Sequence, residues 1–179
     1  PNIKGLEFED FKKQINYFLN NFNILSNDNF AEIVRTKKIP KKKSILLTFD
    51  DGYKDHWKYV YPYLKKKKIS GIFYPPVKAI ENKKVLDVNK IHFTLASTKN
   101  NIDELLIKIN DLLNKYRHQY GLESNDYYFT KLAKPDRFDT KEVVYIKRLL
   151  QMELVEELRG KITDILFKTY VTKDEKSFS

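Results

Sequence analysis

A continuous apolar run at residues 44–49, SILLTF, is followed at once by the sequence Asp-Asp-Gly. An apolar run of this length with an acidic end predicts a buried strand of a parallel sheet. An aromatic-rich helical pattern follows over residues 53–67, where Pro62 predicts a shortened or kinked helix. Residues 69–74, ISGIFY, predict a second strand. Strand, helix and strand in this order predict a βαβ unit with a right-handed crossover.

Helical periodicity also precedes this apolar run. Residues 8–22 place their large apolar side chains at helical spacing, which predicts an amphipathic helix. Ser26 or Asp28 can cap a second, short helix that ends near Thr36. Residues 24–25 predict a short strand at most between the two helices.

From about residue 85 the pattern becomes helical. Apolar spacing predicts three helices, over residues 87–97, 102–119 and 140–158. Gly160 predicts a break before a further helical stretch that ends near Tyr170. Residues 122–139 predict a loop around Pro135, in which the stretch YYFTKLA can form a turn. The front of the chain is therefore α/β, and its two or three strands are fewer than a parallel sheet normally contains, so they form a very small sheet or part of a larger one.

The composition excludes several classes of protein. No cysteine is present among the 179 residues, which excludes disulfide scaffolds, thiolate zinc sites and cysteine nucleophiles. The net charge of +10 comes mainly from lysine, a solvated point charge rather than a bidentate phosphate ligand, so no nucleic-acid partner is expected. No apolar run approaches the roughly 18 residues of a membrane-spanning helix. No export signal is visible, and both cell envelope and cytoplasm stay open as compartments.

The acidic pair Asp50 and Asp51 is the one pattern that points to chemistry. Catalytic groups gather at the carboxyl ends of parallel strands. Two adjacent carboxylates resist simultaneous ionisation unless a positive charge is near, and a divalent metal supplies it, with one carboxylate as ligand and the other as base. Followed by Gly52, the pair also suits an ordinary turn and helix cap, in which Asp51 accepts backbone N–H bonds.

The context of the pair resembles a known family. The stretch ILLTFDDGYKDHWKYVYPYLKKKKISGIFYPP is similar to the first motif, helix and strand of the polysaccharide deacetylases, the NodB-homology enzymes of carbohydrate esterase family 4. TFDDG matches the motif itself, Tyr61-Pro62-Tyr63-Leu64 matches the helix, and Gly71-Ile72-Phe73-Tyr74 matches the strand. The resemblance covers roughly residues 8–80 and implies the N-terminal part of a deformed (β/α) barrel.

By this resemblance Asp50 corresponds to the general base of the family and Asp51 to its metal-ligating carboxylate. The family completes a site for zinc, or a related divalent ion, with two histidines of a later His-x-x-x-His motif. The implied reaction is metal-dependent hydrolysis of the acetamide on an N-acetylated polysaccharide or oligosaccharide, in which activated water attacks the carbonyl. The implied biology is carbohydrate metabolism, commonly at the cell envelope.

The rest of the family pattern is missing from the chain. Its histidines are His56, His92 and His118, and no two of them have the His-x-x-x-His spacing. The later Arg-x-Pro and Leu-x-His segments of the family are also absent. His56 is close enough in sequence to reach the aspartates from the following helix, although a packing or surface role is commoner for a lone helical histidine.

Two explanations account for the missing ligands. In the first, residues 1–84 form the N-terminal βα portion of the domain, residues 85–171 a helical insertion, and residues 172–179 a polar tail at a truncation point. In the second, the protein kept the aspartates and lost the ligands. Truncation is the favoured explanation, and the chain by itself is expected to bind zinc weakly and hydrolyse little.

Two functions of different class follow. The first is a carbohydrate deacetylase, present here as an incomplete fragment. The second is a non-catalytic relative that binds a glycan or a partner protein through aromatic side chains, with candidates Tyr53, Trp57, Tyr74 and Tyr128.

Overall fold

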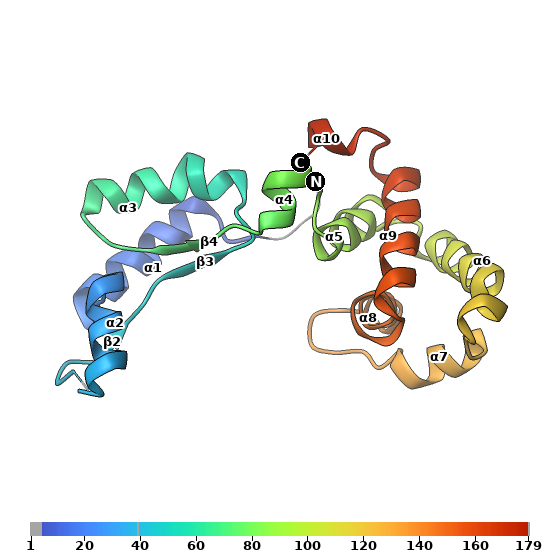
Figure 1. Ribbon diagram of the computed structural model, residues 1–179, viewed down its shortest axis with the longest axis horizontal. Helices are drawn as coiled ribbons and strands as arrows, with labels where there is room; N and C mark the ends of the chain where they lie inside the picture. The colour runs from blue at the N-terminus through green and yellow to red at the C-terminus, as the bar shows by residue number, and fades with distance from the viewer. Residues whose placement is uncertain (1–4, 39, 179) are drawn as a thin grey trace. The chain divides into compact units, whose positions relative to one another are not determined.

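The computed structural model describes residues 5–38 and 40–178 and divides into two compact units (Figure 1). We call residues 5–81 the α/β unit and residues 82–178 the helical unit, and describe each by itself. Residues 1–4 and 179, at the outer ends of the predicted segments, lie outside the described residues.

The α/β unit contains short parallel strands among helices. Its elements are α1 (Phe8–Asn21), β1 (Asn23–Ile24), α2 (Asn27–Thr36), β2 (Ser44–Ile45), β3 (Thr48–Asp50), a π-helical turn η1 (His56–Val60), α3 (Tyr61–Lys67), β4 (Ile72–Tyr74) and α4 (Val77–Asn82). The helices predicted at residues 8–22 and 26–36 are confirmed, and Ser26 caps α2 by accepting a hydrogen bond from the Asn29 backbone N–H.

The predicted strand over residues 44–49 is wrong as a single element. Its first part, β2, pairs in parallel with β1, and its last part, β3, pairs in parallel with β4. The two ladders are separate because each end of the run meets a different partner strand. The predicted βαβ unit is confirmed as β3, η1 with α3, and β4. Sheets of two strands do not close a barrel among the described residues, so the barrel stays a prediction.

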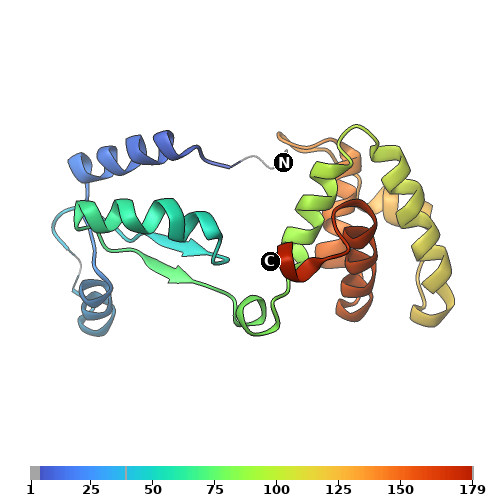
Figure 2. The ribbon, with the colours of Figure 1, turned by 90° about the horizontal axis from the view of Figure 1, so that it is seen from above.

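Aromatic packing holds the helices of the α/β unit against β3 and β4. Figure 2 shows α1 and α3 side by side, and the rings of Phe8 and Phe11 on α1 lie 5.8 and 6.1 Å from that of Tyr63 on α3. Phe49 on β3 stacks on Phe73 of β4 at 4.8 Å. This core therefore covers one face of the β3–β4 ladder.

Pro62 changes the helix that follows the aspartates, as predicted. Proline has no backbone N–H and is best accommodated in the first turn of a helix. It lies in the first turn of α3, and the turn before it is widened, with the Tyr61 N–H donating to the carbonyl of His56 five residues earlier. The irregular turn η1 thus begins only a few residues after the aspartate pair.

The helical unit is built around one apolar core. Its elements are α5 (Asp87–Ser97), α6 (Ile102–Tyr120), α7 (Asn125–Leu132), α8 (Lys141–Arg148), a second π-helical turn η2 (Leu149–Glu153), α9 (Glu156–Tyr170) and α10 (Glu175–Phe178). The helices predicted at residues 87–97 and 102–119 are confirmed as α5 and α6. The inward side chains of α6, among them Leu105 and Ile109, are fully buried.

Two predictions for this unit are wrong. Residues 122–139 contain the helix α7, capped by Ser124 and held by buried Tyr128 and Leu132. The predicted break at Gly160 is wrong, because Gly160 lies inside α9. The long helix is instead interrupted at Leu154, where the backbone is extended and the side chain is buried in the core. In both places tertiary burial overrides local propensity.

Gly160→Ala is expected to stabilise the helical unit by about 0.5–1 kcal/mol, the usual difference between the two residues inside a helix. A Cβ at this position meets only Asp87 Oδ2, at an ordinary 3.9 Å. The measurement is the urea midpoint followed by far-UV circular dichroism. Gly121→Ala is the matched control and should lower the midpoint, because Gly121 has φ +60°. Equal shifts of the two variants would contradict the prediction.

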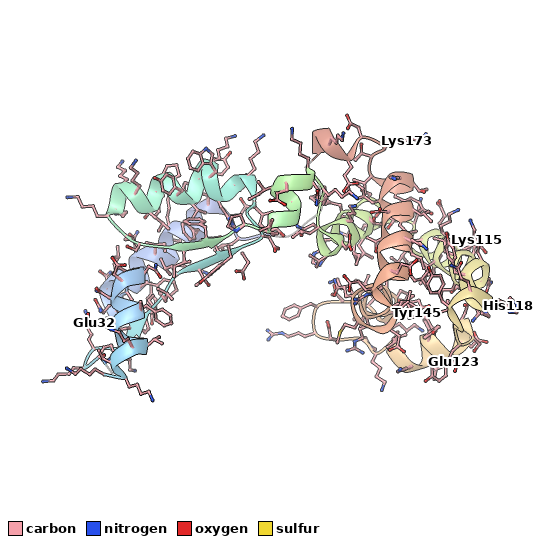
Figure 3. All side chains as sticks on the ribbon, viewed as in Figure 1. Glu32, Lys115, His118, Glu123, Tyr145 and Lys173 are labelled. Carbon is pink, nitrogen blue, oxygen red and sulfur yellow. The ribbon has the colours of Figure 1, made fainter. Side chains whose placement is uncertain are left out.

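Tyr145→Phe is also expected to stabilise the helical unit, by about 1 kcal/mol, because its buried hydroxyl has no hydrogen-bond partner among the described residues and an unsatisfied buried group is costly. Figure 3 shows Tyr145 inside the unit, and burial raises its pKa to about 12. An unfolded tyrosine ionises near its ordinary pKa of 10.0, so the wild type should lose stability as pH rises through 10 towards 12. Unfolding curves at neutral and alkaline pH test this, and a less stable variant would contradict it.

Candidate functional site

The aspartate pair lies at the carboxyl end of β3. Asp50 is the last residue of the strand and is exposed, whereas Asp51 is partly buried. Asp51 and Gly52 both have left-handed backbones, with φ of 67° and 62°. The chain therefore turns sharply between the two carboxylates, which gives neighbouring residues different environments.

Gly52 is required by a close approach as well as by its φ. A Cβ on Gly52 would lie 2.9 Å from the Cβ and 3.1 Å from the Cα of Pro75, just beyond the end of β4. The turn after β3 and the segment after β4 are consequently packed together. This contact fixes the aspartates at the edge where both parallel strands end.

Tyr53 orients Asp51. Its hydroxyl donates a hydrogen bond to Asp51 Oδ2 at 3.1 Å. The sequence pattern indicated Tyr53 only as an aromatic candidate. An aromatic residue two positions after an aspartate is too common a pattern to predict this hydrogen bond. Asp51 is therefore held in place by a side chain, while Asp50 is presented to solvent.

Tyr74 lies beside Asp50 in the ladder. The two residues are register partners in the β3–β4 pairing, next to the pair Phe49 and Phe73 that faces the core. Because side chains alternate along a strand, Asp50 and Tyr74 belong to the face opposite that core. Tyr74 is exposed, so this face carries an acid and an aromatic ring together.

His56 packs against the aromatic residues behind the aspartates. Its ring lies 5.5 Å from Tyr53, 5.6 Å from Phe49 and 6.1 Å from Phe73, all edge-on or tilted. Its Nδ1 is buried and has no hydrogen-bond partner in the part of the chain that the structure describes. Burial lowers the pKa of His56 more than the nearby carboxylates, Asp55 foremost, raise it. The ring is thus a neutral packing group near neutral pH.

The other two histidines lie in the helical unit. His92 is on α5, and Figure 3 shows His118 on the outer surface of α6. Across residues 5–38 and 40–178 no group of three or more histidines and carboxylates could hold a metal ion. Zinc takes three or four protein ligands, so the described residues do not fit a complete zinc site.

Tyr128, the fourth aromatic candidate, is not available to a ligand. It is buried on α7, and its hydroxyl accepts a hydrogen bond from the Glu123 backbone N–H. Its prediction as a glycan-binding residue is wrong, because Tyr128 packs in the helical core.

In the part of the chain that the structure describes, no helix is both long and apolar enough to span a membrane.

A parallel βαβ unit with an oriented pair of aspartates at its carboxyl edge defines the class, an α/β protein with a carboxylate site at a strand end. The sequence model of the polysaccharide deacetylase family matches residues 37–126, half of the chain, and the protein belongs to that family. The matched region includes both aspartates and extends into the helical unit. No curated protein and no solved structure matches the chain.

Membership gives the general chemistry of the family. Polysaccharide deacetylases are hydrolases of the carbohydrate esterase type, act on N-acetylated carbohydrates and are generally metal-dependent. The mixed fold, mostly helical with few short parallel strands, is compatible with part of a NodB-like domain.

Proposed function

We propose that this chain carries the general base and one metal-binding carboxylate of a deacetylase that hydrolyses the acetamide of an N-acetylated polysaccharide or oligosaccharide. The observation that carries the proposal is the different setting of two adjacent carboxylates. Asp50 is exposed at the strand end, and Asp51 is oriented by the Tyr53 hydroxyl. Two roles in one hydrolysis require this kind of separation.

Asp50 is assigned the role of base. Its exposed carboxylate can accept a proton from the water that attacks the acetamide carbonyl. As the C–N bond breaks, acetate leaves and the sugar nitrogen takes up a proton to become a free amine. No described residue is assigned as the acid that delivers this second proton.

Asp51 is assigned as the carboxylate ligand of a divalent ion, zinc by the resemblance. Tyr53 donates to one of its two oxygens, which leaves the other for a cation. A carboxylate with one hydrogen-bonded oxygen is a common metal ligand. Because the described residues do not supply the remaining ligands, no step of the reaction is assigned to the ion.

A second candidate is a non-catalytic relative that binds the same kind of glycan. The incomplete ligand set among the described residues favours it, as do the exposed side chains of Tyr53 and Tyr74 beside the aspartates and of Trp57 on the following turn. Both candidates place the sugar at the end of β3. They differ in whether the acetamide is broken.

One titration locates the ligand and separates the candidates. An N-acetylglucosamine oligomer is added to isotope-labelled protein with zinc present, and amide shifts and free acetate are followed by NMR. The proposal predicts the largest shifts at Asp51, Gly52 and Tyr53, with slow growth of the acetate signal. The same shifts without acetate would refute the deacetylase and support the binding protein. Shifts confined to the helical unit, or none, would refute both.

A further inference from the structure

A row of exposed aromatic side chains begins at the aspartate pair and runs along the following helix. Tyr53, Trp57 and Tyr61 are spaced four residues apart, and Lys65 continues the spacing. We call the three aromatic residues, together with Lys65, the aromatic row. Trp57 is 73% exposed, which is unusual for the largest apolar side chain, and Tyr61 is 38% exposed. Exposed aromatic clusters of this kind mark binding surfaces.

The π-helical turn sets the geometry of the row. The rings of Trp57 and Tyr61 are parallel within 5°, with centroids 5.2 Å apart. Trp57 lies within the turn η1 and Tyr61 directly follows it, and π-helical turns occur frequently at functional sites. The Tyr61 ring also makes an edge-to-face contact with the ring of Phe73, with centroids 6.5 Å apart. Stacking on Tyr61 therefore holds the exposed Trp57 ring in one orientation, so that it is preorganised for a ligand.

The row is continuous with the candidate site. Tyr53, its first member, is itself exposed and donates its hydroxyl hydrogen bond to Asp51 at 3.1 Å. A ligand unit at Asp51 would therefore lie beside the first member of the row, and the further units of a chain-like ligand could follow the row. A polysaccharide is such a ligand, and the apolar faces of sugar rings stack on aromatic side chains.

The charge around the row is strongly positive. Residues 54–68 contain a single carboxylate, Asp55, and their lysines are Lys54, Lys58, Lys65, Lys66, Lys67 and Lys68. The Lys65 Nζ lies 5.7 Å from the centroid of the Tyr61 ring, so a cation adjoins the stacked surface. Such a positively charged surface attracts carboxylates, so it favours an acidic sugar over a neutral one.

We propose that the aromatic row is a binding subsite for acidic sugar units, so that the preferred glycan is an anionic N-acetylated polymer. The Trp57 ring, held in place by its stacking on Tyr61, receives the sugar face, and Lys65 holds the carboxylate of the sugar. This inference rests on the proposed function, because it extends the glycan that the aspartate pair is proposed to receive.

Trp57 reports directly on the subsite because it is the only tryptophan in the chain. Its fluorescence is titrated with an oligosaccharide of alternating glucuronic acid and N-acetylglucosamine, and with a neutral N-acetylglucosamine oligomer of equal length. We expect a change with both and about tenfold tighter binding of the acidic one, equivalent to one favourable charged contact. Added salt should remove that preference. Equal affinities at low salt would overturn the proposal.

Variants test the residues by the same titration. Tyr61→Ala should weaken binding of the acidic oligomer by about tenfold, as for a truncated aromatic contact residue. Lys65→Gln should reduce only the preference for the acidic oligomer. Tyr17→Ala, on α1, is the matched control with an exposed tyrosine of the same unit, and it should bind as the wild type does. Equal losses in Tyr61→Ala and Tyr17→Ala would contradict the subsite.

The outcomes distinguish this inference from the proposed function. Binding at Trp57 without acetate release from any oligomer refutes the deacetylase and retains the subsite. Acetate release without a fluorescence change refutes the subsite alone. A fluorescence change that follows protein concentration in the absence of sugar would show that a second copy covers the row, and would overturn the subsite.

Discussion

Asp50→Asn is expected to lower the rate of acetate release by about 10²–10⁴-fold, the usual contribution of a general base. Asparagine keeps the size of the side chain at the end of β3 but cannot accept the proton of the attacking water. Because Asp50 is exposed and its side chain packs in no core cluster, the fold should be unaffected. The measurement is the initial rate on an N-acetylglucosamine oligomer with zinc added, at a protein concentration comparable to that of the oligomer.

Asp55→Asn is the matched control for this result. Asp55 is an exposed carboxylate on the same segment, immediately before η1, and it is assigned no role in the reaction. Its substitution should leave the rate within about twofold of the wild type, as expected for a change that removes no transition-state contact. If the two variants lose activity equally, or if Asp50→Asn retains the wild-type rate, Asp50 is not the base.

The largest expected effect on stability concerns a buried lysine in the helical unit. The Lys90 side chain is only 2% exposed and forms ion pairs with Asp164 at 2.5 Å and Glu175 at 2.7 Å. Burial lowers the pKa of Lys90, but the hydrogen bonds that Lys90 donates to these two carboxylates outweigh it and raise the pKa above its usual value. Glu175 also accepts a hydrogen bond from the Val85 backbone N–H, so the cluster joins α5, α9 and α10.

Lys90→Met is therefore expected to destabilise the helical unit by about 3 kcal/mol, the lower end for removing one partner of a buried ion pair. Methionine fills most of the space but leaves Asp164 and Glu175 without their cation. The expected loss of stability is at the lower end of the range for buried ion pairs because the Asp164 side chain is partly exposed and can be hydrated. Hydrogen exchange of the α9 backbone amides measures the effect within this unit.

Lys161→Met provides the comparison. Lys161 is also on α9 and also contacts two groups, Glu157 and the Tyr120 hydroxyl, but it is exposed to solvent. An exposed pair of this type contributes at most about 1 kcal/mol. Loss of protection in Lys161→Met as large as in Lys90→Met would show that burial of the Lys90 cluster is not what stabilises the unit.

The parts of the fold that follow from local pattern were predictable from sequence. The apolar spacing of residues 8–22 and 102–119 is regular, and the helices α1 and α6 form there. The order of strand, helix and strand around the aspartates also gave the parallel pairing of β3 and β4. Each of these features needs only a periodic apolar pattern and a terminator.

The features that were missed depend on distant contacts. Leu46 and Leu47 continue the apolar run, yet the pairing of its two ends with β1 and β4 interrupts the strand there. Leu154 ends a helix because its side chain is buried, although a leucine favours helix and Gly160 does not. The helix α7 similarly depends on burial of Tyr128 and Leu132 against the core.

The candidate site, like the fold, was predicted only in part from the sequence. The motif placed Asp50 and Asp51 at the end of a parallel strand, where the structure has them. The hydrogen bond from Tyr53, the contact of Gly52 with Pro75, and the stacking of Trp57 on Tyr61 arise from the turn and from η1. Pro62 indicated that the helix is irregular, but not that the irregular turn would align two aromatic rings.

The most direct test of the proposed deacetylase is the stoichiometry of its two products. The protein is incubated with zinc and a defined N-acetylglucosamine oligomer, and free acetate and new free amine are quantified in the same sample. Hydrolysis of the acetamide predicts that both grow together in equal amounts in the wild type, and that neither grows in Asp50→Asn. Absence of both products from the wild type, with the oligomer bound at the end of β3, would contradict the deacetylase function.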